Sequence, residues 1–239
     1  MATAAALIIG DEILSGKFID ENSPWLIQRC RELGLSLKRL SIISDQLDDI
    51  ADNVRTWSGR VDHVFTTGGV GPTHDDLTMK GVAQAFGVSM VRHPTLEHII
   101  RTRFEGPINE DVLRMAEVPD GAILWEEEDL YFPQIVVHNV CIFPGVPRIF
   151  QKKFNAVSHR FSGRHKHSRR FVTAESETDI AARLRLLVHN HPDVSIGSYP
   201  RFDSKPYTVT VTLDSYDEIA LNAAEQAMAQ ALTRFEPES

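Results

Sequence analysis

The residues best suited to chemistry lie in one glycine-rich stretch, TTGGVGPTHDDLT, which occupies positions 66–78. Glycines permit positive φ angles and close backbone approach, so consecutive N–H groups there can surround an oxyanion. Asp75 and Asp76 follow directly, and two carboxylates should repel a phosphate unless a cation lies between them. Mg²⁺ commonly binds one or two carboxylates together with substrate phosphates. The stretch therefore predicts a phosphate site with a divalent metal, formed by Thr66, Thr67, Gly68, Gly69, Gly71, Thr73, Asp75, Asp76 and Thr78.

The two aspartates also have a structural interpretation. A helix is predicted from Asp76 to Phe86, and a carboxylate at a helix start can cap the free N–H groups and interact with the helix dipole. The same helix start would also favour a bound phosphate. The spacing alone does not decide between a metal-binding role and a capping role for Asp75 and Asp76.

Alternating strand and helix patterns must position this stretch. Apolar runs predict strands at 4–10, 37–44 and 62–69, and helical spacing predicts helices at 22–34, 45–59 and 76–86. This order is typical of an α/β fold with a parallel sheet and helices on both faces. Ligands of such sheets bind beyond the carboxyl ends of the strands. Gly10–Glu12, Ser44–Asp45 and the glycine-rich stretch should therefore meet at one edge.

The rest of the chain suggests a second domain. Helices are predicted at 93–104, 109–119 and 148–161, and short strands at 122–125, 135–138 and 140–143. The basic segment Ser158–Arg170 has few apolar residues, so its middle, within Ser162–Arg169, is interpreted as a linker. The pattern that follows is βαββα, which predicts a small α+β domain. We expect one domain over residues 1–160 and another over residues 170–239.

Composition disfavours several functional classes. The net charge of −8 argues against a broad nucleic-acid interface. No apolar run reaches the length of a membrane span, and the apolar start of the chain resembles a strand more than a signal peptide. Cys30 and Cys141 have no metal-ligand spacing, which favours buried, reduced thiols. We expect a cytoplasmic protein with neither nucleic-acid nor membrane partners.

The stretch TTGGVGPTHDDLT resembles the signature of the molybdopterin-binding fold shared by MoaB, MogA and CinA proteins. GDEILSGKFIDENSPWL, SDQLDDI and FPGVP stand in the order and at the spacing of the CinA N-terminal domain. Together with GSYP, they also match the molybdopterin-binding-like domain of eukaryotic FAD synthases. The resemblance covers nearly the whole chain. It implies a three-layer fold with a mostly parallel sheet over residues 1–160, which holds a nucleotide or a pterin.

The resemblance also assigns roles to individual residues. Asp76 matches the aspartate of the MogA-like motif, and Asp45 matches a second acidic residue that those enzymes use. Both are expected to be catalytic and, with Asp75, to bind the metal. Ligand binding is assigned to the glycine loop and the PG-x-P turn, here Gly68, Gly69, Gly71, Pro72, Pro144, Gly145 and Pro147.

Three activities are compatible with this resemblance. In CinA-type proteins the domain implies a pyrophosphatase that acts on ADP-ribose-like or FAD-like substrates with Mg²⁺, Mn²⁺ or Co²⁺, and with K⁺ as a candidate second cation. In MogA-like proteins it implies molybdopterin binding and adenylylation. A non-catalytic pterin- or nucleotide-binding module is the third alternative. Relatives of this fold associate, so a homodimer or homotrimer is expected.

Several further residues are candidates for the site, each with a simpler alternative. Glu12 follows the first strand and is either a functional carboxylate or a surface group. Asn22 can bind a base or phosphate, or cap a helix. Ser198 and Tyr199, in GSYP, would close over the pocket from a neighbouring subunit, or simply form a turn.

Overall fold

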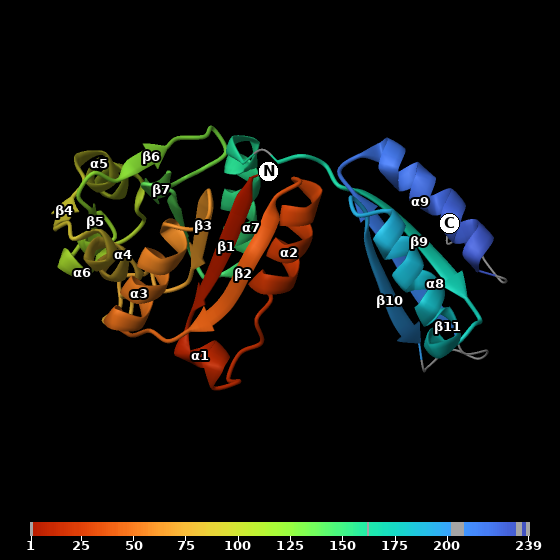
Figure 1. Ribbon diagram of the computed structural model, residues 1–239. Coiled ribbons are helices and arrows are strands. Elements are labelled where there is room, and N and C mark those ends of the chain that lie inside the picture. Colours follow the sequence, from red (N-terminus) through yellow and green to blue (C-terminus); the bar gives the residue numbers. More distant parts are fainter. Residues whose placement is uncertain (1, 162, 202–207, 233–235, 238–239) are drawn as a thin grey trace. The chain divides into compact units, whose positions relative to one another are not determined.

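Buried apolar side chains form separate cores in two parts of the chain. The computed structural model describes residues 2–161, 163–201, 208–232 and 236–237, and the chain divides into Met1–Arg164 and His165–Ser239, here called unit 1 and unit 2 (Figure 1). Two clusters of buried apolar residues belong to unit 1, and a third belongs to unit 2. Each unit therefore has a hydrophobic core of its own.

The sheet of unit 1 is mixed and mostly parallel. Its strand order is β2 (Ser36–Ile43), β1 (Thr3–Ile9), β3 (His63–Thr67), β8 (Val140–Phe143), β7 (Gln134–Val137) and β6 (Ile123–Trp125). The first four strands are parallel, and β7 and β6 pair antiparallel to the neighbouring strands. The predicted α/β class and parallel sheet are confirmed. The carboxyl ends of β2, β1, β3 and β8 share one edge with the start of β7.

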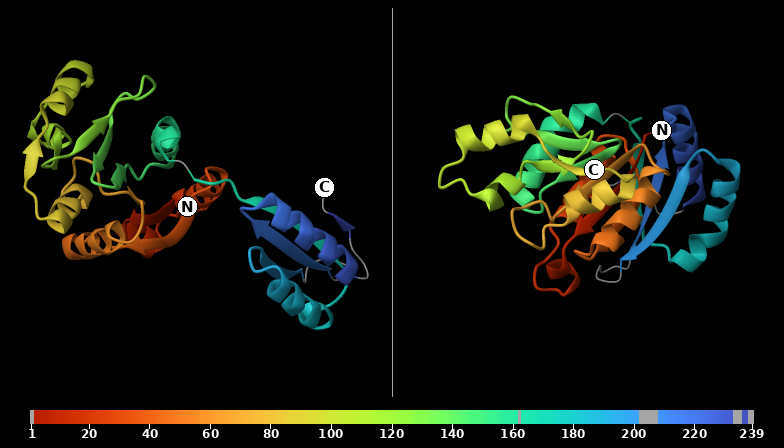
Figure 2. Two further views of the ribbon diagram at one scale, coloured as in Figure 1. Left: turned by 45° about the horizontal axis from the view of Figure 1, so that its top comes forward. Right: turned by 90° about the vertical axis from the view of Figure 1, so that its left-hand side faces the viewer.

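Helices cover both faces of this sheet, as Figures 1 and 2 show. Ala4 and Ala6 face a core with α2 (Asn22–Glu32) and α7 (Pro147–Val157). The alternate residues of β1 face the other core, with α3 (Leu47–Ser58) and α4 (Thr78–Phe86). Successive strand residues point to opposite faces, so a strand buried on both sides must be apolar throughout.

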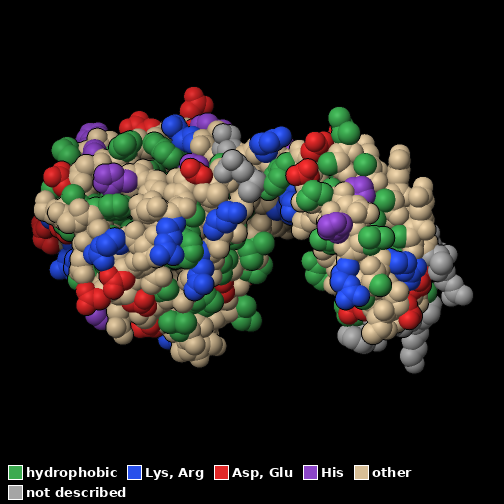
Figure 3. Space-filling view, in the orientation of Figure 1, with side chains coloured by type: hydrophobic (Ala, Val, Ile, Leu, Met, Phe, Trp, Pro, Cys, Tyr) green, Lys and Arg blue, Asp and Glu red, His purple; other side chains and the backbone are tan. Residues whose placement is uncertain are grey.

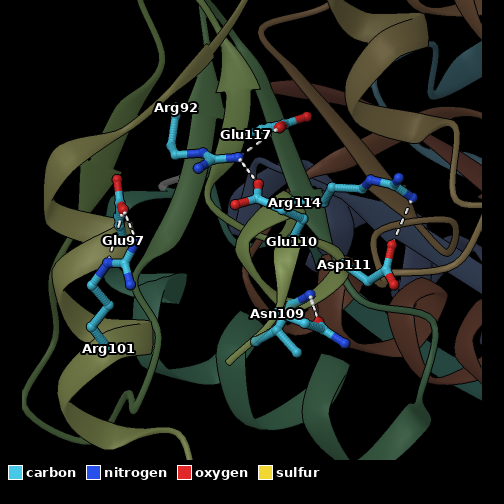
Figure 4. A network of polar contacts seen from close by, with 9 residues as sticks. Arg92, Glu97, Arg101, Asn109, Glu110, Asp111, Arg114 and Glu117 are labelled. Carbon is cyan, nitrogen blue, oxygen red and sulfur yellow. Dashed lines mark hydrogen bonds and ion pairs between the residues drawn. The ribbon is translucent and has the colours of Figure 1, made fainter. Parts of the chain in front are cut away.

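A small lobe adjoins the second core. It contains β4 (Met90–Arg92), α5 (Pro94–Arg103), α6 (Glu110–Arg114) and β5 (Glu117–Pro119), with β4 and β5 paired antiparallel. Arg92 Nη2 lies 2.8 Å from Glu110 Oε2 and 3.5 Å from Glu117 Oε1, and Figure 4 shows the three side chains together. Because such exposed ion pairs contribute little, the buried Leu96, Ile100 and Leu113 hold the lobe to the sheet.

Unit 2 has the predicted βαββα order with one addition. Its elements are β9 (His167–Thr173), α8 (Glu177–Asn190), β10 (Ser195–Arg201), β11 (Thr208–Ser215) and α9 (Glu218–Ala231). A short β12 (Glu236–Pro237) also pairs with β9, giving the strand order β10-β11-β9-β12. Val209, Val211 and Leu213 of β11 face the two helices, which explains the alternating sequence TVTVTLD.

Several predicted boundaries are wrong. The helix expected from Asp76 begins two residues later at Thr78, and that expected over 109–119 ends at Arg114 because Glu117–Pro119 forms β5. For GSYP the strand prediction is confirmed and the alternative of a turn is wrong, since Gly197–Pro200 lies inside the edge strand β10. The basic linker is shorter than expected, since β9 begins at His167; Ser162 lies outside the described residues.

The cysteines, the helix lengths and the surface charges can be compared with what the composition predicts. Cys30 and Cys141 are free and buried, as predicted, and burial raises the pKa of each thiol. Within the described ranges, no helix is long and apolar enough to cross a membrane. Figure 3 shows acidic and basic side chains sharing one face of unit 1.

Candidate functional site

The segments predicted to converge do meet at the carboxyl edge of the unit 1 sheet. The Gly10 amide donates to the Ile43 carbonyl at 3.2 Å, and the Asp11 amide donates to Asp45 Oδ2 at 2.8 Å. Beside them lies a cavity of about 860 Å³, whose lining residues all belong to unit 1. Its polar end contains Glu12, Asn22, Thr67, Gly68, Gly69, Gly71, Asp76, Pro144 and Gly145.

The glycine loop requires glycine for two different reasons. Gly68 has φ +107°, and a β-carbon there would collide with the backbone carbonyl oxygen of Ile9. Gly69 has φ +58°, and its β-carbon would lie 2.6 Å from Thr78 Oγ1 and 3.4 Å from Asp45 Oδ1. Glycine at position 68 therefore allows the loop to pack against the backbone at Ile9. Glycine at position 69 allows the loop backbone to lie next to the carboxylate of Asp45.

Fewer backbone amides of the loop are free to bind an anion than the sequence predicts. The Gly68 amide donates to the Phe143 carbonyl at 3.2 Å, and the Thr73 amide donates to Asp76 Oδ2 at 2.8 Å. Among the described residues, the amides of Gly69, Val70 and Gly71 donate to no protein acceptor. An anion would therefore be held by these three consecutive residues.

The hydroxyls of Thr67, Thr73 and Thr78 donate to protein acceptors, whereas that of Thr66 is buried without a partner. Thr67 Oγ1 donates to the Pro144 carbonyl at 2.8 Å, and Thr78 Oγ1 donates to the Gly68 carbonyl at 2.7 Å. Thr73 Oγ1 donates to Asp76. The expectation that the hydroxyls of Thr67, Thr73 and Thr78 bind phosphate is thus not supported, because each already has a protein acceptor.

Asp76 braces the loop and does not cap the helix. Its Oδ2 accepts from both the amide and the hydroxyl of Thr73, and α4 begins after Leu77, without a side-chain cap. A β-carbon on Gly71 would lie 2.7 Å from the same oxygen, so glycine there makes room for the carboxylate. Asp76 is half-buried and lines the cavity, whereas the neighbouring Asp75 is exposed.

Asp45 borders the cavity behind Gly69 and is not among the lining residues. Burial raises the pKa of its carboxyl, and the nearby negative charges of Glu12, Asp11 and Asp75 raise it further. Crowding of this kind favours a cation. Across the described ranges, however, no three His, Cys, Asp or Glu side chains are placed to hold a metal ion. A metal ion at these carboxylates would therefore need further oxygen ligands, such as the phosphates of a bound ligand.

Asn22 ties three segments together at the polar end. It is the first residue of α2, not its cap; Asp20 Oδ1 accepts from the amides of Asn22 and Ser23. Asn22 Nδ2 donates to Thr67 Oγ1 at 3.1 Å and to the Gly145 carbonyl at 2.8 Å. Asn22 Oδ1 is buried and has no partner. The amide thus fixes the Pro144–Gly145 turn against β3.

The other end of the cavity is apolar and contains one cation that sequence reasoning missed. Its walls include Ile100 and Phe104 of the small lobe and Ile135 of β7. Lys153 lines the same cavity from α7 and is only 8% exposed. A signal was present in PRIFQKKFNAV, where Phe150, Lys153, Phe154 and Val157 recur at helical spacing and form the buried face of α7.

The remaining candidates are not among the lining residues of this cavity. Ser198 and Tyr199 belong to β10 of unit 2, where Ser198 Oγ donates to Glu177 Oε1 at 2.7 Å and Tyr199 is exposed. Pro72 is exposed and does not line the cavity. A second cavity of about 70 Å³ on the loop is lined by Thr73, Asp76, Lys80 and Arg114, among others.

Both units match known protein families. Residues 5–161 match the family described as a probable molybdopterin binding domain, and residues 165–236 match the middle domain of FAD synthase. The chain is 32% identical over 258 residues to a probable FAD synthase of Caenorhabditis elegans, covering 96% of this chain and 50% of that protein. It thus spans about half the length of that relative.

One further relative is similar in length to this chain, and another matches a smaller share of it. A protein of Archaeoglobus fulgidus is 31% identical, covering 94% of this chain and 95% of its own. A CinA-like protein of Anaeromyxobacter dehalogenans is 37% identical, covering 59% of this chain and 36% of its own. The crystal structure of a CinA protein from Thermoplasma acidophilum is similar, with 26% identity, a TM-score of 0.61, and coverage of 66% and 97%.

Proposed function

Because this chain belongs to the molybdopterin-binding domain family and its unit 2 matches the FAD synthase middle domain, we propose that it is a metal-dependent pyrophosphatase of FAD-type or ADP-ribose-type dinucleotides. One observation carries the proposal. The free amides of Gly69–Gly71, the carboxylate of Asp76 and a large apolar compartment share one cavity. A dinucleotide has the matching parts, a diphosphate next to flat rings.

The residues of this chain suggest how the phosphates would be held. The amides of Gly69–Gly71 would bind phosphate oxygens, next to the carboxylates of Asp45 and Asp76. Either carboxylate can accept the proton of the attacking water. Hydrolysis places the water oxygen on one phosphate and leaves the bridging oxygen on the other, so FAD would give AMP and FMN. A divalent cation bound with the substrate would neutralise phosphate charge.

The direct test is an assay for AMP. The protein is incubated with FAD or ADP-ribose and Mg²⁺, Mn²⁺ or Co²⁺, with and without K⁺, and the products are separated by chromatography. We expect AMP with FMN or ribose 5-phosphate, and none with EDTA. Binding without turnover would instead favour a non-catalytic module. Transfer of AMP from ATP to a pterin phosphate would favour the adenylyltransferase alternative.

The arrangement of carboxylates also predicts how metal and nucleotide binding are coupled. Because no three acidic side chains in the described part of the chain are placed to hold a metal ion, Mn²⁺ alone should bind weakly. Addition of AMP should tighten Mn²⁺ binding by at least about tenfold, since phosphate oxygens would complete the coordination. Calorimetric titration measures both affinities. Equal Mn²⁺ affinity with and without AMP would contradict a shared metal.

A further inference from the structure

Lys153 is a buried cation that the proposed hydrolysis does not use. It lies on the inner face of α7, between Phe150 and Phe154, and is 8% exposed. Its Nζ donates to the Pro133 carbonyl at 2.9 Å and lies 5.7 Å from the centroid of the Phe132 ring. Its amine thus lies at the boundary between the α7 core and the cavity.

Within the described part of the chain, no carboxylate compensates this charge. Burial alone lowers the pKa of Lys153 to about 8, with no contribution from a nearby Asp or Glu. An ammonium group has three donors, and the Pro133 carbonyl uses one of them. Burying a charge without a partner is costly. The two remaining donors therefore need acceptors, and the cavity is where a ligand can supply them.

The strand order locates Lys153 relative to the glycine loop. Gln134 begins β7 beside the end of β8, because Ile135 pairs with Ile142, so Pro133 lies at the same edge as the glycine loop after β3. Two strand spacings of about 4.8 Å separate β3 from β7, or roughly 10 Å. Phosphates on the loop would thus place the attached group near Lys153.

The surroundings of Lys153 define the chemistry of that group. The apolar walls suit a flat ring, and the ammonium suits ring-edge carbonyl oxygens and unprotonated nitrogens. Flavins and pterins carry such a pyrimidinone edge. Adenine offers unprotonated ring nitrogens but no carbonyl oxygen, and beside its N1 and N7 the amino group, a donor, would face the ammonium, another donor.

We propose that Lys153 is the ring-recognition residue of the cavity, donating to the carbonyl-bearing edge of a flavin- or pterin-type ring and selecting it against adenine. This inference rests on the cavity of the proposed function and narrows its substrate class, placing FAD-type compounds ahead of ADP-ribose. The proposal concerns binding, so it can be tested without turnover.

The test compares affinities for single halves of the substrate. FMN, a pterin monophosphate and AMP are titrated separately into the full chain, its Lys153→Met variant and its Lys152→Met variant. Lys152 is the matched control, because it is adjacent, exposed and outside the cavity lining. We expect Lys153→Met to weaken binding of FMN or the pterin phosphate at least about tenfold, to leave AMP binding unchanged, and to alter the absorption spectrum of bound flavin. Lys152→Met should change none of these.

The outcomes separate this inference from the proposed hydrolysis. A selective loss of FMN binding identifies a flavin site, and a selective loss of pterin binding identifies a pterin site. Equal losses for FMN, pterin and AMP, or no loss, would overturn the role of Lys153 even if AMP is released from FAD. If Lys153→Met does not fold, the wild type decides: AMP bound as tightly as both FMN and the pterin phosphate would refute the selection.

Discussion

Single residues at the loop combine structural and chemical roles. Asp76 was expected either to cap a helix or to bind a metal, and the structure shows a third arrangement in which it braces Thr73. A carboxylate that accepts two hydrogen bonds through one oxygen still has its other oxygen and its charge. Bracing and catalysis are therefore compatible, and substitutions must separate them.

We expect Asp76→Asn to lower the turnover of pyrophosphate hydrolysis by about a hundredfold or more, the scale of losing one positioned electrostatic contact. Asparagine keeps an oxygen that can accept from Thr73, so the loop should keep its shape. Turnover, together with circular dichroism, measures both effects.

Thr73→Val is the matched control, because it removes the hydroxyl donor and leaves the charge of Asp76 in place. It should cost turnover far less than Asp76→Asn. If the two variants lose activity equally, bracing explains the loss and the catalytic assignment fails. Asp75→Asn, at the exposed position directly before Asp76, tests whether removing any negative charge from the loop lowers turnover to the same extent.

The burial of Lys153 predicts a pH-dependent stability. Its pKa is lowered to about 8 in the fold, below the ordinary lysine value of about 10.4 in the unfolded chain. Between these values the unfolded chain binds more protons, so stability rises with pH. Lys153→Met should be more stable than wild type at pH 7, by on the order of 1–3 kcal/mol. Above pH 8 this advantage should shrink.

Urea denaturation at pH 7 and at pH 9.5 measures the free energy of unfolding of both proteins. Lys152→Met again serves as the control, with little change at either pH. An advantage of Lys153→Met that is the same at both pH values would show that packing, and not the buried charge, causes it.

At the scale of elements, the site depends on close backbone contact between the loop after β3 and the turn after β8. Gly145 lies so close to Gly68 that a β-carbon on Gly145 would be 3.2 Å from the Gly68 α-carbon. Asn22 and Thr67 join the same two turns through hydrogen bonds. The loop after β3 and the turn after β8 are therefore one structural unit.

Two glycines of the loop should respond differently to alanine. Gly68→Ala places a methyl group against the Ile9 carbonyl at φ +107° and should destabilise the fold by at least about 2 kcal/mol. Gly71 has no positive φ, and the atoms nearest to its methyl group would be those of the Asp76 carboxylate, the end of a side chain. Gly71→Ala should keep the melting temperature and lower ligand affinity.

Thermal denaturation and calorimetric titration with AMP distinguish the two glycine variants. A Gly68→Ala protein as stable as wild type would contradict the packing role. A Gly71→Ala protein with wild-type affinity would show that displacement of Asp76 does not affect the anion site.

For the whole molecule, the junction between the units should be the first point of proteolysis. The Gly163 amide donates to the Leu33 carbonyl, and β9 begins at His167. Exposed residues Arg164–Lys166 remain between them. Trypsin should therefore cut first after Arg164 or Lys166, leaving a fragment that retains the cavity, because every lining residue precedes the cut.

Mass spectrometry of an early digest identifies the first cut, and titration of the purified fragment with AMP tests the retained site. Arg164→Gln combined with Lys166→Gln should slow the cleavage. First cuts within the glycine loop would contradict this organisation, as would a fragment that no longer binds a ligand bound by the full chain.

The sequence by itself determined the α/β class, most of the strands and the edge at which the polar segments meet. Those features depend on local patterns, namely alternation, helical spacing and glycine positions. Even Val140–Phe143 was predicted with its observed bounds, because a continuous apolar run between turns leaves few alternatives.

Only the tertiary structure decided which polar groups are free. The hydroxyls of Thr67 and Thr78 look available in the sequence. In the structure, however, that of Thr67 donates to the carbonyl of Pro144, far away in the chain, and that of Thr78 donates to the carbonyl of Gly68. Lys153 looks like a surface residue by type, yet the apolar neighbours of α7 bury it against β7. Hydrogen-bond partners and burial depend on segments far apart in the chain, and local sequence patterns carry no information about those distances.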